Sequence, residues 1–106
     1  MNREEILNGA KDCVCVDREN TYGKPEDNFA TIANLWSEYL FAKGVLEELI
    51  DSDDVAVMMA LLKIARIAAG KAKEDNYIDL AGYAACAGEI ATKKTFKKLK
   101  ENDNYV

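Results

Sequence analysis

Two cations interrupt an otherwise apolar segment of the chain. Residues 54–69 read DVAVMMALLKIARIAA, where Lys63 and Arg66 are the only side chains after Asp54 that are not apolar. They are three positions apart, so on a helix they occupy neighbouring positions of one face. A charge on a buried helix is costly unless it is paired. Two interpretations stay open: the cations pair with carboxylates or snorkel to solvent, or they hold an anionic group such as a phosphate.

Carboxylates gather where the last helix is expected to begin. Asp75 and Asp79 are one helical turn apart, and Asn76 stands three residues before Asp79. Mg²⁺ requires one or two carboxylates together with phosphate oxygens, not a complete cage of protein ligands. Acids at helix starts also act as caps, and this explanation requires no ligand. The candidate Mg²⁺ ligands are Glu26, Asp54, Asp75 and Asp79.

The segment DRENTYGKPEDN, residues 17–28, has the most unusual composition. A Tyr-Gly pair interrupts the helical pattern, and Pro25 suits the first position of a new helix. The helix dipole explains the acids of that first turn. It does not explain why Arg18, Tyr22 and Lys24 crowd the same turn. The candidate ligand- or phosphate-binding residues of the chain are Arg18, Tyr22, Lys24, Asn28, Lys63, Arg66, Asn76 and Tyr83.

Apolar residues recur at helical spacing in four segments, so the sequence predicts a single all-α domain over residues 1–106, a compact bundle of four main helices. The segment at about 53–69 is apolar on nearly all sides and is expected to be the buried, central helix. Asn76 with Asp79 is expected to cap the last helix, and the tail from about residue 101 is expected to be loose. The other expected helices are Arg3 to Asp17, Pro25 to Lys43, and one that follows Asn76.

Composition excludes several classes of function. The chain has 106 residues, a net charge of −5 and no histidine, so histidine acid–base catalysis and histidine metal ligands are excluded. An acidic chain is a poor ligand for duplex DNA. The central segment spans roughly 24 Å and carries two cations, which argues against a membrane helix. The polar start MNREEILNGAKD is unlike a signal peptide, and a cytoplasmic protein of an infected bacterial host is expected.

The longer pattern resembles a phage and prophage protein family of unassigned function. The family pattern DRExxYGxPExNFxxIAxLW matches residues 17–36, and the KxxR of Lys63 and Arg66 and the DNYIDLAGYA of residues 75–84 follow it. These elements also resemble nucleotide-modification-associated domains of phages, which are similar to MazG-like all-α nucleotide pyrophosphohydrolases. The resemblance covers roughly residues 13–92.

The resemblance implies Mg²⁺-dependent cleavage of a nucleoside triphosphate to monophosphate and pyrophosphate, in dimers or tetramers. That superfamily uses ExxE on one helix and ExxD on a later one. This chain has Asn76 in place of the Glu of ExxD and no clear ExxE on a helix before it. A member that binds a nucleotide without cleaving it would keep Lys63, Arg66 and Tyr83 and lose carboxylates.

Three functions are therefore compared. The first is a nucleotide-binding phage protein of MazG-like type, acting as a Mg²⁺-dependent pyrophosphohydrolase on a (deoxy)nucleoside triphosphate. The second is a non-catalytic counter-defence protein that sequesters a host nucleotide signal. The third is a structural or inhibitory homo-oligomer. A content of 49% hydrophobic residues in so small a domain predicts a homodimer or higher homo-oligomer in each case.

Overall fold

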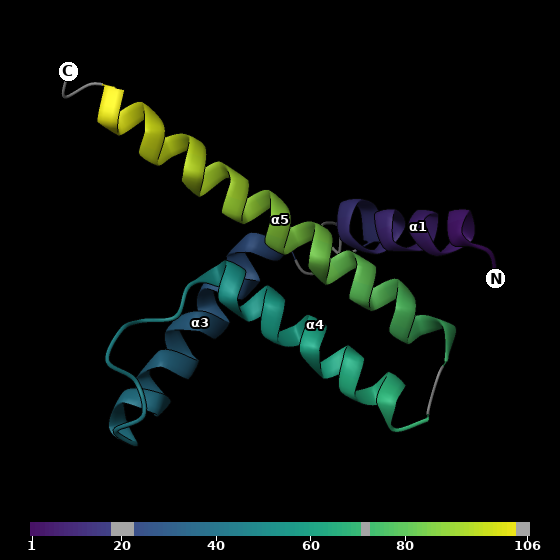
Figure 1. Cartoon of the computed structure of the whole chain (residues 1–106), viewed down its shortest axis with the longest axis horizontal. Helices are drawn as coiled ribbons and strands as arrows, with labels where there is room; N and C mark the ends of the chain where they lie inside the picture. The colour runs from purple at the N-terminus through teal and green to yellow at the C-terminus, as the bar shows by residue number, and fades with distance from the viewer. Residues whose placement is uncertain (18–22, 71–72, 104–106) are drawn as a thin grey trace.

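A computed structural model describes residues 1–17, 23–70 and 73–103 and shows an all-α bundle of four main helices (Figure 1). The elements are α1 (Arg3–Asp12), the π-helical turn η1 (Cys13–Asp17), α3 (Pro25–Ala42), α4 (Ser52–Ala68) and α5 (Glu74–Asp103). The predicted fold class is confirmed. None of the helices in the described part of the chain is long and apolar enough to cross a membrane.

Local sequence sets most of the helix ends. The Asn2 side chain accepts a hydrogen bond from the backbone N–H of Glu5 at 2.8 Å, and the Glu5 carboxylate accepts one from the Asn2 N–H in return. This arrangement is a capping box. The helices α3 and α4 end just before Gly44 and Gly70, whose φ angles of 78° and 81° lie in the left-handed region that glycine tolerates.

The longest helix, α5, lies at the centre of the packing. It runs antiparallel to α4, and α1 and η1 pack on it as well (Figure 1). The helix α3 packs mainly against α4. Where α3, α4 and α5 meet, their apolar side chains form the core, which consists of Phe29, Ala33, Val55, Ala56, Cys86 and Ile90. Trp36 packs against this core, as its sequence position on α3 predicts.

The expectation that the helix at 53–69 is buried on all sides is wrong within one chain. In α4 only Val55 and Ala56 are fully buried, and α1 packs on α5. The outer face of α4 is exposed although its side chains are apolar. Its exposed large hydrophobic residues are Val57, Met58, Leu61, Leu62 and Ile64.

Both ends of the last helix differ from their predicted positions. The helix begins at Glu74, so Asn76 lies inside its first turn and is buried instead of standing before the helix as a cap. The helix also continues to Asp103, where the sequence predicted a loose tail from about residue 101. In Figure 1 its C-terminal half extends beyond the bundle. The helix continues past residue 101 because its lysine, leucine and glutamate residues are good helix formers and give no sharp stop.

A buried serine ties the link before α4 to α3. Ser37 is 1% exposed, and its hydroxyl oxygen accepts a hydrogen bond from the backbone N–H of Ile50 at 3.1 Å. A buried hydroxyl without a partner would be costly, so this bond satisfies the serine and fixes the approach to α4.

Small residues of α5 allow η1 to approach closely. A Cβ atom placed on Gly82 would lie 3.0 Å from Cγ1 of Val14, whereas one on Gly88 would meet nothing within 4 Å. The Ala- and Gly-rich run of α5 therefore serves the contact with η1, while α5 also packs against α4.

This difference gives a matched test. Gly82→Leu should destabilise the fold by about 1–3 kcal/mol because the side chain collides with Val14. Gly88→Leu should leave stability unchanged or raise it by up to about 1 kcal/mol, because leucine is the better helix former. Urea unfolding measures both, and equal effects of the two substitutions would contradict the packing of η1 on α5.

Candidate functional site

Lys63 of α4 forms an ion pair with Asp79 of α5, a residue that the sequence predicted as a Mg²⁺ ligand. Lys63 Nζ on α4 lies 2.9 Å from Asp79 Oδ2 on α5, with side chains 11% and 35% exposed. The cation is thus nearly buried at the seam between the two helices, and its partner is half-buried. Breaking such a pair leaves one charge without its counter-ion, so the contact fixes the register of α4 on α5. This arrangement matches the first of the two interpretations of Lys63.

Four other predicted residues lie within about one helical turn of Lys63 on α4 or of Asp79 on α5. Asn76 is buried one turn before Asp79, and the Tyr83 ring is tilted by 50° against that of Phe29, with ring centroids 6.1 Å apart. Asp75 is exposed. Arg66 is also exposed and forms no ion pair within the described residues, so here it does not neutralise a buried acid.

A second group of charges lies at the opposite end of α4. Asp51 caps the helix, and the Asp54 carboxylate accepts a hydrogen bond from the Asp51 N–H at 2.8 Å. Oxygen atoms of Asp51, Asp53 and Asp54 all lie within 4.8 Å of one another. Lys94 Nζ on α5 lies between two of them, 3.0 Å from Asp51 Oδ2 and hydrogen-bonded to Asp53. The lysine takes the place that a cation would fill among these carboxylates.

The ion pairs between Lys94 and the carboxylates shift the pKa values of Asp53 and of Lys94 itself. The hydrogen bond from Lys94 lowers the pKa of Asp53 below 3.8, more strongly than burial raises it. For Lys94, burial opposes the charged form, but the hydrogen bonds and charges of Asp53 and Asp51 together outweigh it and raise its pKa above 10.5. Both shifts favour the ionised pair.

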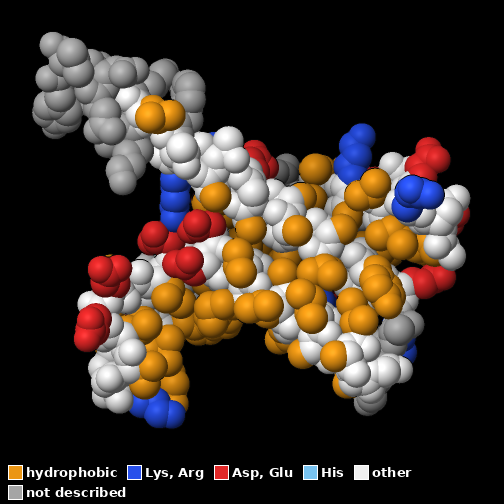
Figure 2. All heavy atoms as spheres, in the orientation of Figure 1, with side chains coloured by type: hydrophobic (Ala, Val, Ile, Leu, Met, Phe, Trp, Pro, Cys, Tyr) orange, Lys and Arg blue, Asp and Glu red, His pale blue; other side chains and the backbone are white. Residues whose placement is uncertain are grey.

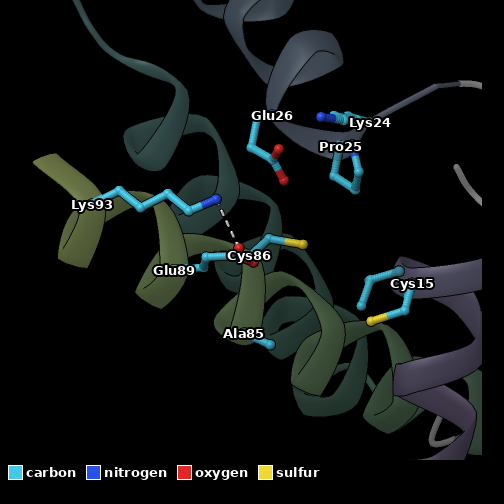
Figure 3. Close-up of a pocket in the computed structure, with 9 residues that line it drawn as sticks. Cys15, Lys24, Pro25, Glu26, Ala85, Cys86, Glu89 and Lys93 are labelled. Atoms are coloured by element: carbon cyan, nitrogen blue, oxygen red, sulfur yellow. Dashed lines mark ion pairs between the residues drawn. The ribbon is translucent and has the colours of Figure 1, made fainter.

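A pocket of about 260 Å³ lies where η1, the start of α3 and α5 meet (Figure 3). Val14, Cys15 and Pro25 line its walls, and Cys86 lies at its base. Four charged side chains complete it, two from each of α5 and the start of α3: Lys24, Glu26, Glu89 and Lys93. The described part of the chain thus has charges of both signs from separate elements around one cavity.

Two of these charged residues were predicted and two were not. Lys24 and Glu26 belong to the unusual segment before α3, whereas Glu89 and Lys93 lie on α5 with the ordinary spacing of a surface ion pair. Lys93 Nζ lies 2.9 Å from Glu89 Oε1, and this hydrogen bond, with the charges of Glu89 and Glu26, raises the pKa of Lys93.

The structure does not bring the four predicted Mg²⁺ ligands together within one chain. Asp79 lies beside Lys63 of α4. Asp54 precedes Lys63 by nine residues, so it is roughly 13 Å away from this ion pair along α4. Glu26 lines the pocket beside Glu89, which follows Asp79 by ten residues, or roughly 15 Å along α5. The set is therefore divided between the two ends of the α4–α5 pair, with Asp75 and Asp79 at one end and Glu26 and Asp54 at the other.

The remaining predicted residues lie in or beside the segment before α3. Arg18 and Tyr22 lie outside the described residues. Asn28 is half-buried in the first turns of α3. Cys13 and Cys15 are exposed and Cys86 is buried, and all three are free thiols.

Comparison with known proteins gives the family. A domain of unknown function, DUF6378, matches residues 5–91, which include most of α1, all of α3 and α4, and the pocket residues of α5 up to Glu89. The chain belongs to this family. It is 40% identical over 87 residues to the Gene 55 protein of Mycobacterium phage D29, and 42% identical over 102 residues to the Gene 55 protein of Mycobacterium phage L5.

These relatives are longer than this DUF6378 chain. The matches cover 82% and 96% of this chain but 54% and 53% of the two phage proteins, so the chain spans about half of their length. No solved structure matches the chain. The predicted resemblance to a phage protein family of unassigned function is confirmed.

The ion pairs of Lys94 lead to a pH-dependent prediction. Lys94→Met should lower the free energy of unfolding at pH 7 by about 0.5–1 kcal/mol, because exposed pairs are screened by solvent. The folded-state pKa of Asp53 is depressed, so its contribution is present above about 3.8 and is lost as the pH falls through the lower, folded-state value. The difference between wild type and Lys94→Met should therefore shrink below pH 3.8.

Urea unfolding at pH 7, 5, 4 and 3 measures this difference. Lys93→Met is the matched control, since Lys93 is adjacent and, within the described residues, its ion pair is with Glu89 of its own helix. A difference that stays constant down to pH 3 would contradict the role assigned to Asp53.

Proposed function

We propose that this DUF6378 protein binds a phosphorylated nucleotide together with Mg²⁺ in the pocket between η1, α3 and α5. The observation that supports the proposal is the placement of two lysines and two glutamates from separate elements around one cavity of about 260 Å³. Binding sites for charged small molecules are typically concave and have a few convergent polar groups. Of the two groups of predicted residues, this one borders a cavity within the described part of the chain.

The charges of the pocket suit a nucleotide phosphate only when a cation is present. Lys24 and Lys93 are balanced by Glu26 and Glu89, so the empty lining has no net charge to attract an anion. Carboxylate oxygens are the ligands that Mg²⁺ prefers, and phosphate oxygens complete its coordination. In this proposal Glu26 and Glu89 hold Mg²⁺, and Lys24 and Lys93 neutralise the phosphate. Bound Mg²⁺ would supply positive charge to polarise a phosphoryl group.

The pocket accommodates either of two activities. As a pyrophosphohydrolase the protein would release pyrophosphate from a nucleoside triphosphate. As a counter-defence protein it would hold a host nucleotide signal without cleaving it. The carboxylates of Asp51, Asp53 and Asp54 are close enough together for one cation, but Lys94 already neutralises their charge. Turnover of a nucleoside triphosphate panel with Mg²⁺ separates the two activities.

Calorimetric titration of the chain with the panel, with and without Mg²⁺, tests the location. Lys24→Ala should weaken binding by about 1.5–3 kcal/mol through the loss of one charge-assisted phosphate contact. Folding should be little affected, because Lys24 makes no side-chain capping bond to α3. Glu26→Gln should remove the dependence on Mg²⁺. Lys43→Ala, at the other end of α3, is the matched control and should bind as wild type does.

The residues at the opposite end of α4 and α5 provide the competing location. If the site lies there, Arg66→Ala and Asp79→Asn should weaken Mg²⁺-dependent binding while Lys24→Ala and Glu26→Gln leave it unchanged. In the proposed pocket the reverse holds, and Asp79→Asn should instead lower the free energy of unfolding because Lys63 loses its partner. Absence of binding to every nucleotide in the panel would contradict the proposed function at either location.

A further inference from the structure

The lysines that form ion pairs in the described part of the chain are held with different firmness. Charged side chains lie mainly at the edges of the face in Figure 2, around an apolar middle. Lys63 is 11% exposed beside Asp79, and Lys94 contacts two carboxylates at once. Lys93 and Glu89 form the most exposed of these pairs, with side chains 66% and 57% accessible, and both line the pocket. This pair therefore combines weak attachment with a place at a cavity.

The geometry of Lys93 allows its ammonium group to change partners. Its Nζ lies 2.9 Å from Glu89 Oε1, and the Glu26 carboxylate points into the same part of the cavity (Figure 3). An exposed pair of this kind contributes little to stability, so its exchange for another partner costs little. Lysine carries its charge on a flexible four-carbon stem. The ammonium group can therefore turn from Glu89 to another acceptor in the pocket while the backbone of α5 stays in place.

We propose that Lys93 is a movable counter-ion of the pocket, which makes the site bind a divalent cation and a phosphate group together and neither of them alone. The inference rests on the proposed function of this pocket. Before a ligand binds, Lys93 neutralises Glu89. When a divalent cation binds to Glu26 and Glu89, the ammonium group leaves Glu89 and turns to the phosphate. The ligand class is therefore a phosphate group that carries a divalent cation.

The sum of the charges in the lining gives the reason. Lys24 and Lys93 balance Glu26 and Glu89. A divalent cation alone would leave two ammonium groups beside it without an anion, and a phosphate alone would meet two carboxylates. A phosphate group has a charge of about −1.5 to −2 at neutral pH, so the two ligands together restore the balance. Each ligand therefore raises the affinity for the other, and such coupling is typically about 5- to 150-fold.

The affinity of the pocket for Mn²⁺ without nucleotide tests the role of Lys93. It is measured from the paramagnetic broadening of backbone amide signals near Glu26 and Glu89. Lys93→Met should bind Mn²⁺ about three- to tenfold more tightly than wild type, because the ammonium group no longer competes with the cation. Lys43→Met removes the same charge at the other end of α3, and this matched control should bind Mn²⁺ as wild type does.

Titration of each variant with the nucleoside triphosphate panel, with and without Mg²⁺, tests the coupling. Lys93→Met should weaken binding of the Mg²⁺ complex by about tenfold or more, because one charge-assisted phosphate contact is lost. The substitution thus acts in opposite directions on the bare cation and on the complex, whereas the loss of an ordinary surface pair would change neither. Circular dichroism confirms that each variant is folded.

The two measurements separate this inference from the proposed function. Nucleotide binding that depends on Mg²⁺, combined with an unchanged or weaker Mn²⁺ affinity in Lys93→Met, would overturn the counter-ion role and leave the proposed function in place. Tighter Mn²⁺ binding in Lys93→Met without nucleotide binding in any variant would contradict the proposed function and support the competition between Lys93 and the cation. Mn²⁺ broadening confined to signals near Asp51, Asp53 and Asp54 would overturn both.

Discussion

The antiparallel packing of α4 on α5 is the constraint on which the rest of the structure depends. Val55 and Ala56 of α4 meet Cys86 and Ile90 of α5 in the core, and ion pairs hold the two ends of the contact. Apolar packing is not directional, and it would tolerate a shift of one helix along the other. The two lysines, one from each helix, remove that freedom because a shift would separate both from their carboxylates. The positions of α1, η1 and α3 then follow from the surfaces that the pair leaves open.

The sequence determined the helices better than their assembly. Helix starts and stops depend on nearest neighbours, so the Asn2 capping box and the glycines at 44 and 70 could be recognised directly. The division of the predicted carboxylates could not be recognised in this way. Acids on three helices are close or distant according to the direction in which those helices pack, and periodicity gives a face but not a direction. Asp54 and Asp79 were grouped by residue type, and antiparallel packing separates them.

The pocket residues show the same limit. Lys24 and Glu26 were noticed because they crowd a turn, whereas Glu89 and Lys93 form an i, i+4 pair that is common on exposed helices. Their importance arises only from the approach of α3, which no local pattern encodes. On the outer side of α4 the structure departs from the prediction in another way. Its apolar sequence predicted burial, and its large hydrophobic side chains are exposed on the chain.

The π-helical turn η1 makes the N-terminal segment tolerant of a change in length. A π turn closes its hydrogen bonds over five residues instead of four, so it contains one residue more than the α-helical turn that could take its place. Deleting one residue between Cys13 and Asp17 would return this turn to regular α-helical pitch, and α1 would keep the face that it presents to α5. Gly9, where an added Cβ atom would lie 3.1 Å from Ile78 of α5, would stay in contact with that side chain. A gap in an alignment of related chains here would therefore mean a shorter turn, with the helix before it in the same orientation.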